Sequence, residues 1–146
     1  MNFDFRFQRA ERLKSEKVIS SLFKKGRSFS CYPLRLVYTE IDPLPKASGQ
    51  VNIKADSTDF SPVQFSLSVS KKKFKRAVDR NLLRRRIRES YRLQKHELYL
   101  FLKDHTTLSE KQFAFMVIYT AKDALPYADI HKGIRKMIAK FKMENG

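Results

Sequence analysis

The segment from residue 77 to residue 102 has the residue spacing of a long helix with two different faces. At about 100° per residue, an apolar stripe runs along it, formed by Leu83, Ile87, Tyr91 and Leu98. A polar and mainly cationic stripe adjoins it within roughly 100° of arc, formed by Asn81, Arg84, Arg85, Arg88 and Arg92. Such a helix must bury its apolar stripe in a core, which leaves the guanidinium groups on a rigid outer surface.

Positive charge is concentrated around the start of this helix. Between Lys71 and Arg92 the chain has 11 Lys and Arg against two acids, Asp79 and Glu89, well above an even spread of its 31 basic residues. Acids four positions away, which would neutralise a merely soluble helix, are almost absent. Each guanidinium offers a planar fork of donors to phosphate oxygens, so we interpret this face as a nucleic-acid surface. A solvated charged face and a surface for an acidic protein remain as alternatives.

The composition is that of one small domain. The 146 residues, 42% of them hydrophobic, suffice for a modest single core despite a net charge of +16. This charge predicts strong, salt-dependent attraction to a polyphosphate. The single cysteine, Cys31, excludes an internal disulfide, and the sequence shows neither a secretory h-region nor an apolar run of membrane-spanning length. We therefore expect a soluble, cytoplasmic protein.

Helical and strand patterns alternate along the rest of the chain. Ser15 is a suitable N-cap for a short first helix, which ends before Gly26. Alternating apolar residues predict strands at 34–38 and 63–69, and we expect these two strands to pair. A continuous apolar run at 113–120 predicts a buried strand.

The last helix is expected to begin after Pro126. Its apolar face consists of Ile130, Ile134, Met137, Ile138 and Phe141. Residues 1–12 form a polar, aromatic-interleaved arm, and residues 42–62 have the composition of an exposed loop. The order of helix, strands, long basic helix, strand and helix predicts an α+β fold, a single-domain α/β sandwich in which helices cover one sheet.

Side chains that could perform catalysis are sparse. His96, His105 and His131 are scattered, and the four glycines do not form a phosphate-binding loop. Asp79 falls in the first turn of the basic helix, where the helix dipole is sufficient to explain an acid. We therefore assign no catalytic residue and no metal ligand, and we expect a nucleic-acid binder without nuclease machinery of its own.

Two stretches, Leu67 to Lys72 and Ala77 to Glu89, resemble the protein component of bacterial ribonuclease P. The likeness extends to Arg12-Leu-Lys, Phe23 and Gly26 upstream and to the final strand and helix downstream, so it covers nearly the whole chain. It implies a small basic protein that assists a large catalytic RNA in removing the 5′ leader of precursor tRNA by metal-dependent hydrolysis. It also implies a left-handed crossover through the long helix.

The resemblance implies two RNA-binding surfaces. One docks on the catalytic RNA and consists of Arg80, Asn81, Arg84, Arg85, Arg88 and Arg92. The other is a cleft for the single-stranded leader, made by Ile19, Phe23, Tyr38, Ser68, Lys71, Lys72 and Tyr119. The chain departs from the family pattern at Leu82, where the family has an arginine, and at Ile19, where it has an aromatic residue. The turn at 73–76 is one residue longer than in the family.

The resemblance further implies a subunit of an endoribonuclease, with Mg²⁺ acting mainly through the RNA subunit and one protein monomer bound to each RNA. A structural or ribosomal RNA-binding protein without a processing role is the alternative, and it would have no leader cleft. Phe23 is left open between two roles. It could stack on a leader base, but its position four residues after Ile19 is also that of a core residue in any packed helix.

Overall fold

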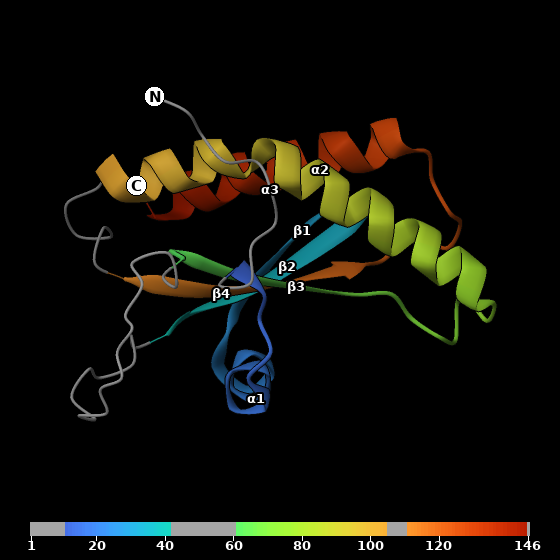
Figure 1. Ribbon diagram of the computed structural model, residues 1–146, viewed down its shortest axis with the longest axis horizontal. Helices are drawn as coiled ribbons and strands as arrows, with labels where there is room; N and C mark the ends of the chain where they lie inside the picture. Colours follow the sequence, from blue (N-terminus) through green and yellow to red (C-terminus); the bar gives the residue numbers. More distant parts are fainter. Residues whose placement is uncertain (1–10, 42–60, 105–110, 146) are drawn as a thin grey trace, which may run out of the picture.

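A computed structural model describes residues 11–41, 61–104 and 111–145 (Figure 1). Within these ranges, three helices and four strands form the α+β fold that the sequence predicts. In chain order they are α1 (Glu16–Lys25), β1 (Arg27–Cys31), β2 (Leu34–Ile41), β3 (Val63–Ser68), α2 (Ala77–Asp104), β4 (Gln112–Tyr119) and α3 (Tyr127–Asn145). Most of the predicted arm and exposed loop lies outside the described residues.

The four strands form one mixed sheet in the order β1-β2-β4-β3. β2 is antiparallel to both β1 and β4, whereas β3 is parallel to β4. The predicted pairing of 34–38 with 63–69 is therefore wrong, because β4 lies between these strands. The burial patterns give the reason: β4 is buried on both faces, as a central strand must be, whereas β3 alternates between buried and half-buried residues.

The connection from β3 through α2 to β4 joins two adjacent parallel strands, as a βαβ unit does. The left hand implied for this crossover stays a prediction. β1 was not anticipated as a separate strand, because its sequence, Arg-Ser-Phe-Ser-Cys, has only one fully buried residue, Phe29.

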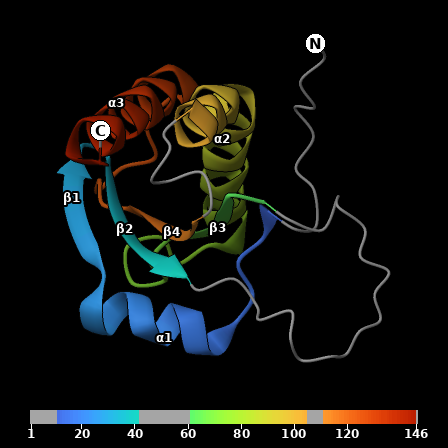
Figure 2. The same ribbon diagram turned by 90° about the vertical axis from the view of Figure 1, so that its left-hand side faces the viewer.

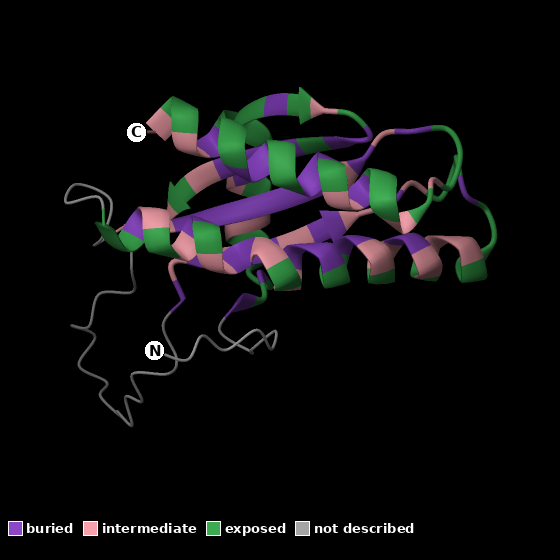
Figure 3. Ribbon diagram, turned by 90° about the horizontal axis from the view of Figure 1, so that it is seen from above, coloured by how far each residue is buried: buried purple, intermediate pink, exposed green. Residues whose placement is uncertain are grey.

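Helices lie on both faces of the sheet: α2 and α3 on one, α1 on the other (Figure 2). The larger core fills the space beneath α2 and α3, whose buried residues face the sheet (Figure 3). Its centre is aromatic: the Phe141 ring lies 4.9 Å from the Tyr38 ring and 5.0 Å from the Phe115 ring, between centroids. A smaller core beneath α1 consists of Leu13, Leu22, Val37, Ala114 and Met116.

The ends of α1 form as the sequence predicts. The Ser15 side chain accepts a hydrogen bond from the Val18 N–H at 3.3 Å, which satisfies one of the free donors of the first turn. The Gly26 N–H donates to the Leu22 carbonyl at 2.9 Å. A Cβ at Gly26 would collide with that same carbonyl oxygen, so this close approach requires glycine. The described helices include none that is long and apolar enough to cross a membrane.

Candidate nucleic-acid interface

The cationic face of α2 points away from the core, as its spacing predicts. Leu83 and Ile87 are fully buried, whereas Arg85 and Arg88 on the neighbouring face are exposed and Arg84 is half-buried. Among the described residues, none of these three arginines forms an ion pair with an acid. No described acid therefore neutralises their charge.

Two of the predicted RNA-docking arginines have partners within the protein. Arg80 Nη1 donates to the carbonyls of Phe74 and Lys75, at 2.9 and 3.0 Å, and so fixes the turn before α2. Arg92 pairs with Glu89 at 2.7 Å, and this contact raises the pKa of Arg92 and lowers that of Glu89. Arg80 thus supports the surface, whereas Asn81 is an exposed part of it.

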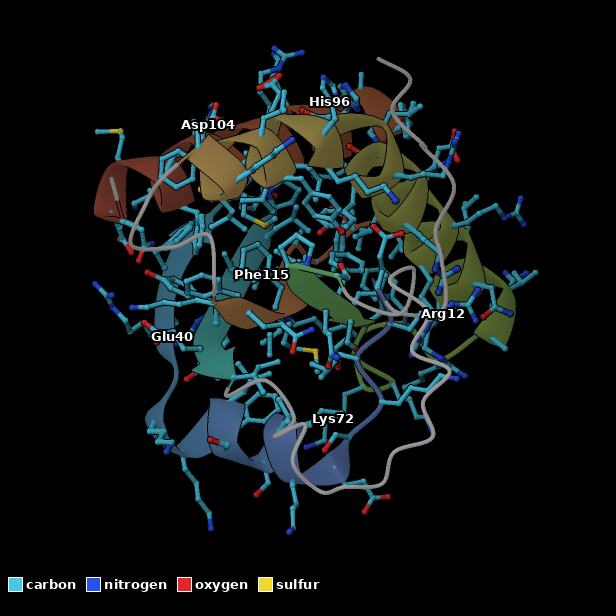
Figure 4. All side chains as sticks on the ribbon, turned by 60° about the vertical axis from the view of Figure 1, so that its left-hand side comes forward. Arg12, Glu40, Lys72, His96, Asp104 and Phe115 are labelled. Carbon is cyan, nitrogen blue, oxygen red and sulfur yellow. The ribbon has the colours of Figure 1, made fainter. Side chains whose placement is uncertain are left out.

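A pocket of about 400 Å³ opens between α2, β3 and the chain that precedes α1. It is lined by Arg12, Leu13, Lys14, Phe65, Ser66, Leu67, Arg84 and Arg88. Figure 4 shows Arg12 at the edge of the sheet, beside the first half of α2. Arg12 and Lys14 were not among the predicted site residues, although both belong to the Arg-Leu-Lys stretch that carried part of the family likeness.

The charges around this pocket are all positive. Partial burial of its guanidinium, followed by the positive charges of Arg84 and Arg12, lowers the pKa of Arg88. The lining contains no acidic residue. Several arginines that repel one another around a polar hollow are stabilised when phosphate oxygens bind between them.

The turn after β3 holds two exposed lysines of the predicted leader cleft, Lys71 and Lys72. Ser70 Oγ accepts the N–H groups of Lys72 and Lys73 at 3.1 and 3.3 Å, which fixes the turn locally. Phe74 anchors the longer segment, because its buried ring packs edge-on against another core ring. Lys72 lies on the α1 side of the sheet (Figure 4).

Three further cleft residues belong to α1 and the sheet face beneath it. Phe23 has 60% of its surface exposed. This exposure excludes the alternative interpretation, in which Phe23 is a core residue. Ile19 is half-buried and packs in the smaller core together with Ile118. Ser68 is half-buried and lies opposite Ile118 in the register of β3 and β4. Ile19 and Ser68 therefore both lie on the α1 side of the sheet.

Tyr38 and Tyr119 do not lie in this cleft. Both are buried in the core on the opposite face, at 1% and 2% exposure. The Tyr38 hydroxyl donates to Glu144 at 2.8 Å, and the Tyr119 hydroxyl accepts from the Leu125 N–H at 2.9 Å. Neither ring has a surface on which a base could stack. The prediction that both belong to the leader cleft is therefore wrong, and both are core residues. In β2, Val37 faces α1 in place of Tyr38.

Within residues 11–41, 61–104 and 111–145, no group of three His, Cys, Asp or Glu side chains is placed to hold a metal ion. His131 Nδ1 lies 2.9 Å from Ser90 Oγ, but Gln94 and Tyr127 also contact that nitrogen, in the polar packing between α2 and α3. This arrangement serves helix packing.

Comparison with known proteins assigns the family. The model of the family described as Ribonuclease P matches residues 7–142. The chain belongs to the ribonuclease P protein family. A ribonuclease P protein component from Porphyromonas gingivalis is 33% identical over 141 residues, which cover 93% of this chain and 86% of that protein. One from Chlorobaculum tepidum is 31% identical over 119 residues, covering 81% and 70%.

Two solved ribonuclease P proteins share the fold. The Staphylococcus aureus protein superposes with a TM-score of 0.58 at 20% identity, covering 90% of this chain and 94% of the other. The Thermotoga maritima protein superposes with a TM-score of 0.60 at 17% identity, covering 89% and 96%. Membership of the ribonuclease P family also decides between the two functions that the sequence leaves open. It favours a ribonuclease P subunit over a ribosomal or purely structural RNA-binding protein.

Proposed function

We propose that the protein acts as the protein subunit of ribonuclease P and docks on the catalytic RNA through the first half of α2. The observation that carries this proposal is the group of Arg84, Arg85 and Arg88, held on a rigid helix without a described acidic partner. Asn81 extends the surface toward the start of the helix. Arg80 supports it by fixing the preceding turn, and Arg92 joins it when its contact with Glu89 yields to phosphate.

The 5′ leader of precursor tRNA is the second ligand that we propose. The exposed ring of Phe23 offers a stacking surface for an unpaired base, which is worth about 1–3 kcal/mol. Lys72 supplies positive charge for the leader phosphates on the same side of the sheet (Figure 4), and Lys71 precedes it in the same turn. Ile19 and Ser68 form the floor between them. The leader therefore lies across the α1 face of the sheet, whereas the catalytic RNA lies along α2.

The hydrolysis itself belongs to the RNA subunit in this proposal. Mg²⁺ acts there, and the protein contributes affinity for the substrate and neutralises phosphate charge, so that fewer metal ions are needed. We propose one protein monomer for each RNA, because the net charge of +16 opposes association between free copies. The complex works in the cytoplasm, where precursor tRNA is made.

Reconstitution tests the proposal. The full chain is mixed with transcribed ribonuclease P RNA and a precursor tRNA that carries a leader, at an Mg²⁺ concentration at which the RNA alone is nearly inactive. We expect the protein to restore cleavage at the mature 5′ end. An unrelated protein of equal net charge is the control, because simple charge screening would help equally. Equal stimulation by both proteins would refute the proposal.

A further inference from the structure

A buried ion pair attaches the beginning of the described chain to α2. The Nζ atom of Lys95 lies 2.7 Å from both carboxylate oxygens of Glu11. The two side chains are only 1% and 6% exposed. The Tyr99 hydroxyl donates a further hydrogen bond to Glu11 Oε2 and lies 3.4 Å from Ser61 Oγ. One carboxylate is thus held by two residues of α2.

Such a pair is not needed for stability as such. Removing two charges from water costs about as much as their attraction returns, so well-packed apolar residues often stabilise a core equally well. A buried pair can instead select one arrangement of the chain, because any other would leave a buried charge without a partner. The Glu11–Lys95 pair is therefore suited to fixing where the segment before α1 lies.

The residues that follow Glu11 are placed beside the arginines of α2. Arg12 forms a parallel bridge with Phe65 of β3, and the Leu13 N–H donates to the Phe65 carbonyl at 3.0 Å. Arg12 then lines the 400 Å³ pocket together with Arg84 and Arg88. One short segment thus has a buried anchor at Glu11 and a cation in the pocket at its next residue.

Three cations, Arg12, Arg84 and Arg88, meet at this pocket. Partial burial of its guanidinium, followed by repulsion from Arg84 and Arg12, lowers the pKa of Arg88. The adjacent Glu11 contributes a buried ion pair that holds this part of the chain against α2. Lys95 follows Arg84 by eleven positions, about three helical turns, and so lies on the same side of α2. That side carries the half-buried Arg84 at the pocket and the buried, paired Lys95 three turns later.

We propose that Glu11 is a positioning residue: its buried pair with Lys95 holds Arg12 at the pocket, where Arg12, Arg84 and Arg88 together bind one phosphodiester segment of RNA. This inference rests on the proposed docking of α2 on the catalytic RNA. It adds Arg12 to the RNA-binding surface and gives a function to a carboxylate that never contacts RNA.

A double-mutant cycle tests the proposal with full-length protein and transcribed ribonuclease P RNA. Arg12→Ala and Glu11→Gln should each weaken binding about fivefold and lower the salt slope of affinity by about one, the value of one phosphate contact. If Glu11 acts through Arg12, the double variant should bind no more weakly than Arg12→Ala alone. Effects that multiply in the double variant would overturn the proposal.

A second variant covers the case in which Glu11→Gln fails to fold. Glu11→Gln combined with Lys95→Met leaves no buried charge without a partner, and we expect a cooperative melt close to that of the wild type. The Leu13 amide, which donates to Phe65, should nevertheless exchange with solvent at least tenfold faster, and the salt slope should again fall by about one. The exposed pair Glu40–Lys111 provides the control, because Glu40→Gln with Lys111→Met should change neither quantity.

The two readouts separate the inference from the proposed function. Hydrogen exchange at Leu13 is measured on the protein alone, so unchanged protection in the Glu11→Gln, Lys95→Met variant would overturn the positioning role whatever the RNA does. If wild-type protein does not bind ribonuclease P RNA above its affinity for an unrelated RNA of equal length, the proposed docking fails. Faster exchange at Leu13 would still establish the anchor in that case.

Discussion

The rings of Phe65 and Tyr91 lie stacked, with centroids 4.0 Å apart and planes inclined by 11°. Phe65 belongs to β3 and Tyr91 to α2, so this contact fixes the rotation of α2 about its own axis at the edge of the sheet. Arg84 and Arg88 precede Tyr91 by seven and three positions and therefore lie on the side of the helix next to this contact. Both arginines line the pocket beside β3, together with Phe65 itself.

Replacing Arg84, Arg85 and Arg88 together by Ala should weaken binding to ribonuclease P RNA. Three phosphate contacts are lost, so the slope of log affinity against log salt should flatten by roughly 2 to 3. The melting temperature should change little, because none of the three is buried. Filter binding at several salt concentrations measures the slope.

A matched control removes equal charge from a different face. Lys132, Arg135 and Lys136 are exposed on α3. Their triple replacement by Ala lowers the net charge by the same amount, but it should leave most of the slope intact. Equal losses in the two triple variants would mean that RNA responds to total charge and that α2 is not the docking surface.

Phe23→Ala should reduce the preference of the holoenzyme for precursor over mature tRNA by about 1 kcal/mol, or roughly fivefold. The ring is 60% exposed, so its loss should cost little stability. Paired affinity measurements on precursor and mature tRNA, with a thermal melt of each variant, check both statements. A variant that keeps its full precursor preference would remove Phe23 from the leader site.

Tyr119→Phe is the matching variant for a core residue, as Phe23→Ala is for an exposed one. It removes the hydroxyl that bonds the Leu125 N–H and the Asp123 carbonyl, so it should lower the free energy of unfolding by about 1 to 2 kcal/mol. The precursor preference should remain that of the wild type, because the ring is buried away from α1. A selective loss of precursor affinity in this variant would restore Tyr119 to the cleft.

Alkaline pH should destabilise the fold through Tyr91, which is fully buried, and Tyr99, which is half-buried. Burial is the main cause that raises the pKa of both Tyr91 and Tyr99 above the ordinary value. They stay protonated in the folded protein when the unfolded chain begins to ionise near pH 10. Their contribution to stability is therefore complete below pH 10 and falls above it, by about 1.4 kcal/mol per pH unit for each tyrosine.

Urea unfolding between pH 8 and pH 11.5 measures this dependence. The double variant Tyr91→Phe, Tyr99→Phe is the reference, since lysines titrate over the same range in both proteins. The wild type should lose stability more steeply than the variant above pH 10. Parallel curves would show that these hydroxyls titrate in the folded state as they do in the unfolded chain.

The isolated protein should not cleave precursor tRNA at any Mg²⁺ concentration, because the proposed catalytic centre lies in the RNA. Gel analysis of end-labelled precursor, with reconstituted holoenzyme as the positive control, checks this expectation. Specific cleavage at the mature 5′ end by protein freed of RNA by nuclease treatment would place catalysis in the protein.

The sequence predicted the helices well because their signals are local. The cap at Ser15 and the two stripes of α2 follow from spacing within a few turns. The partner of each strand was not predictable in this way, since β4 enters the sheet between strands that precede it in the chain. Its nearly continuous burial became informative only once the position of the strand was known.

The candidate site was predicted where helical spacing applied and missed where long-range packing decided. Arg84 and Arg88 were found from their face of α2, whereas Arg12 reaches the same pocket through contacts of Glu11 with α2. Tyr38 was assigned to the cleft by resemblance, although it shares the alternation phase of Leu34 and Leu36. That phase places it in the core, and strand periodicity was the better guide here.

The central position of β4 also bears on how the protein is made. Until residue 119 has left the ribosome, β2 and β3 cannot pair with the complete β4. Until then, α2 has no complete sheet to cover. Pairings between such distant segments form late and slowly. The emerging chain therefore presents the basic residues between Lys71 and Arg92 before it has a core, in a cell full of competing polyanions. We expect its folding yield during synthesis to depend on how well it is shielded from unrelated RNA in that interval.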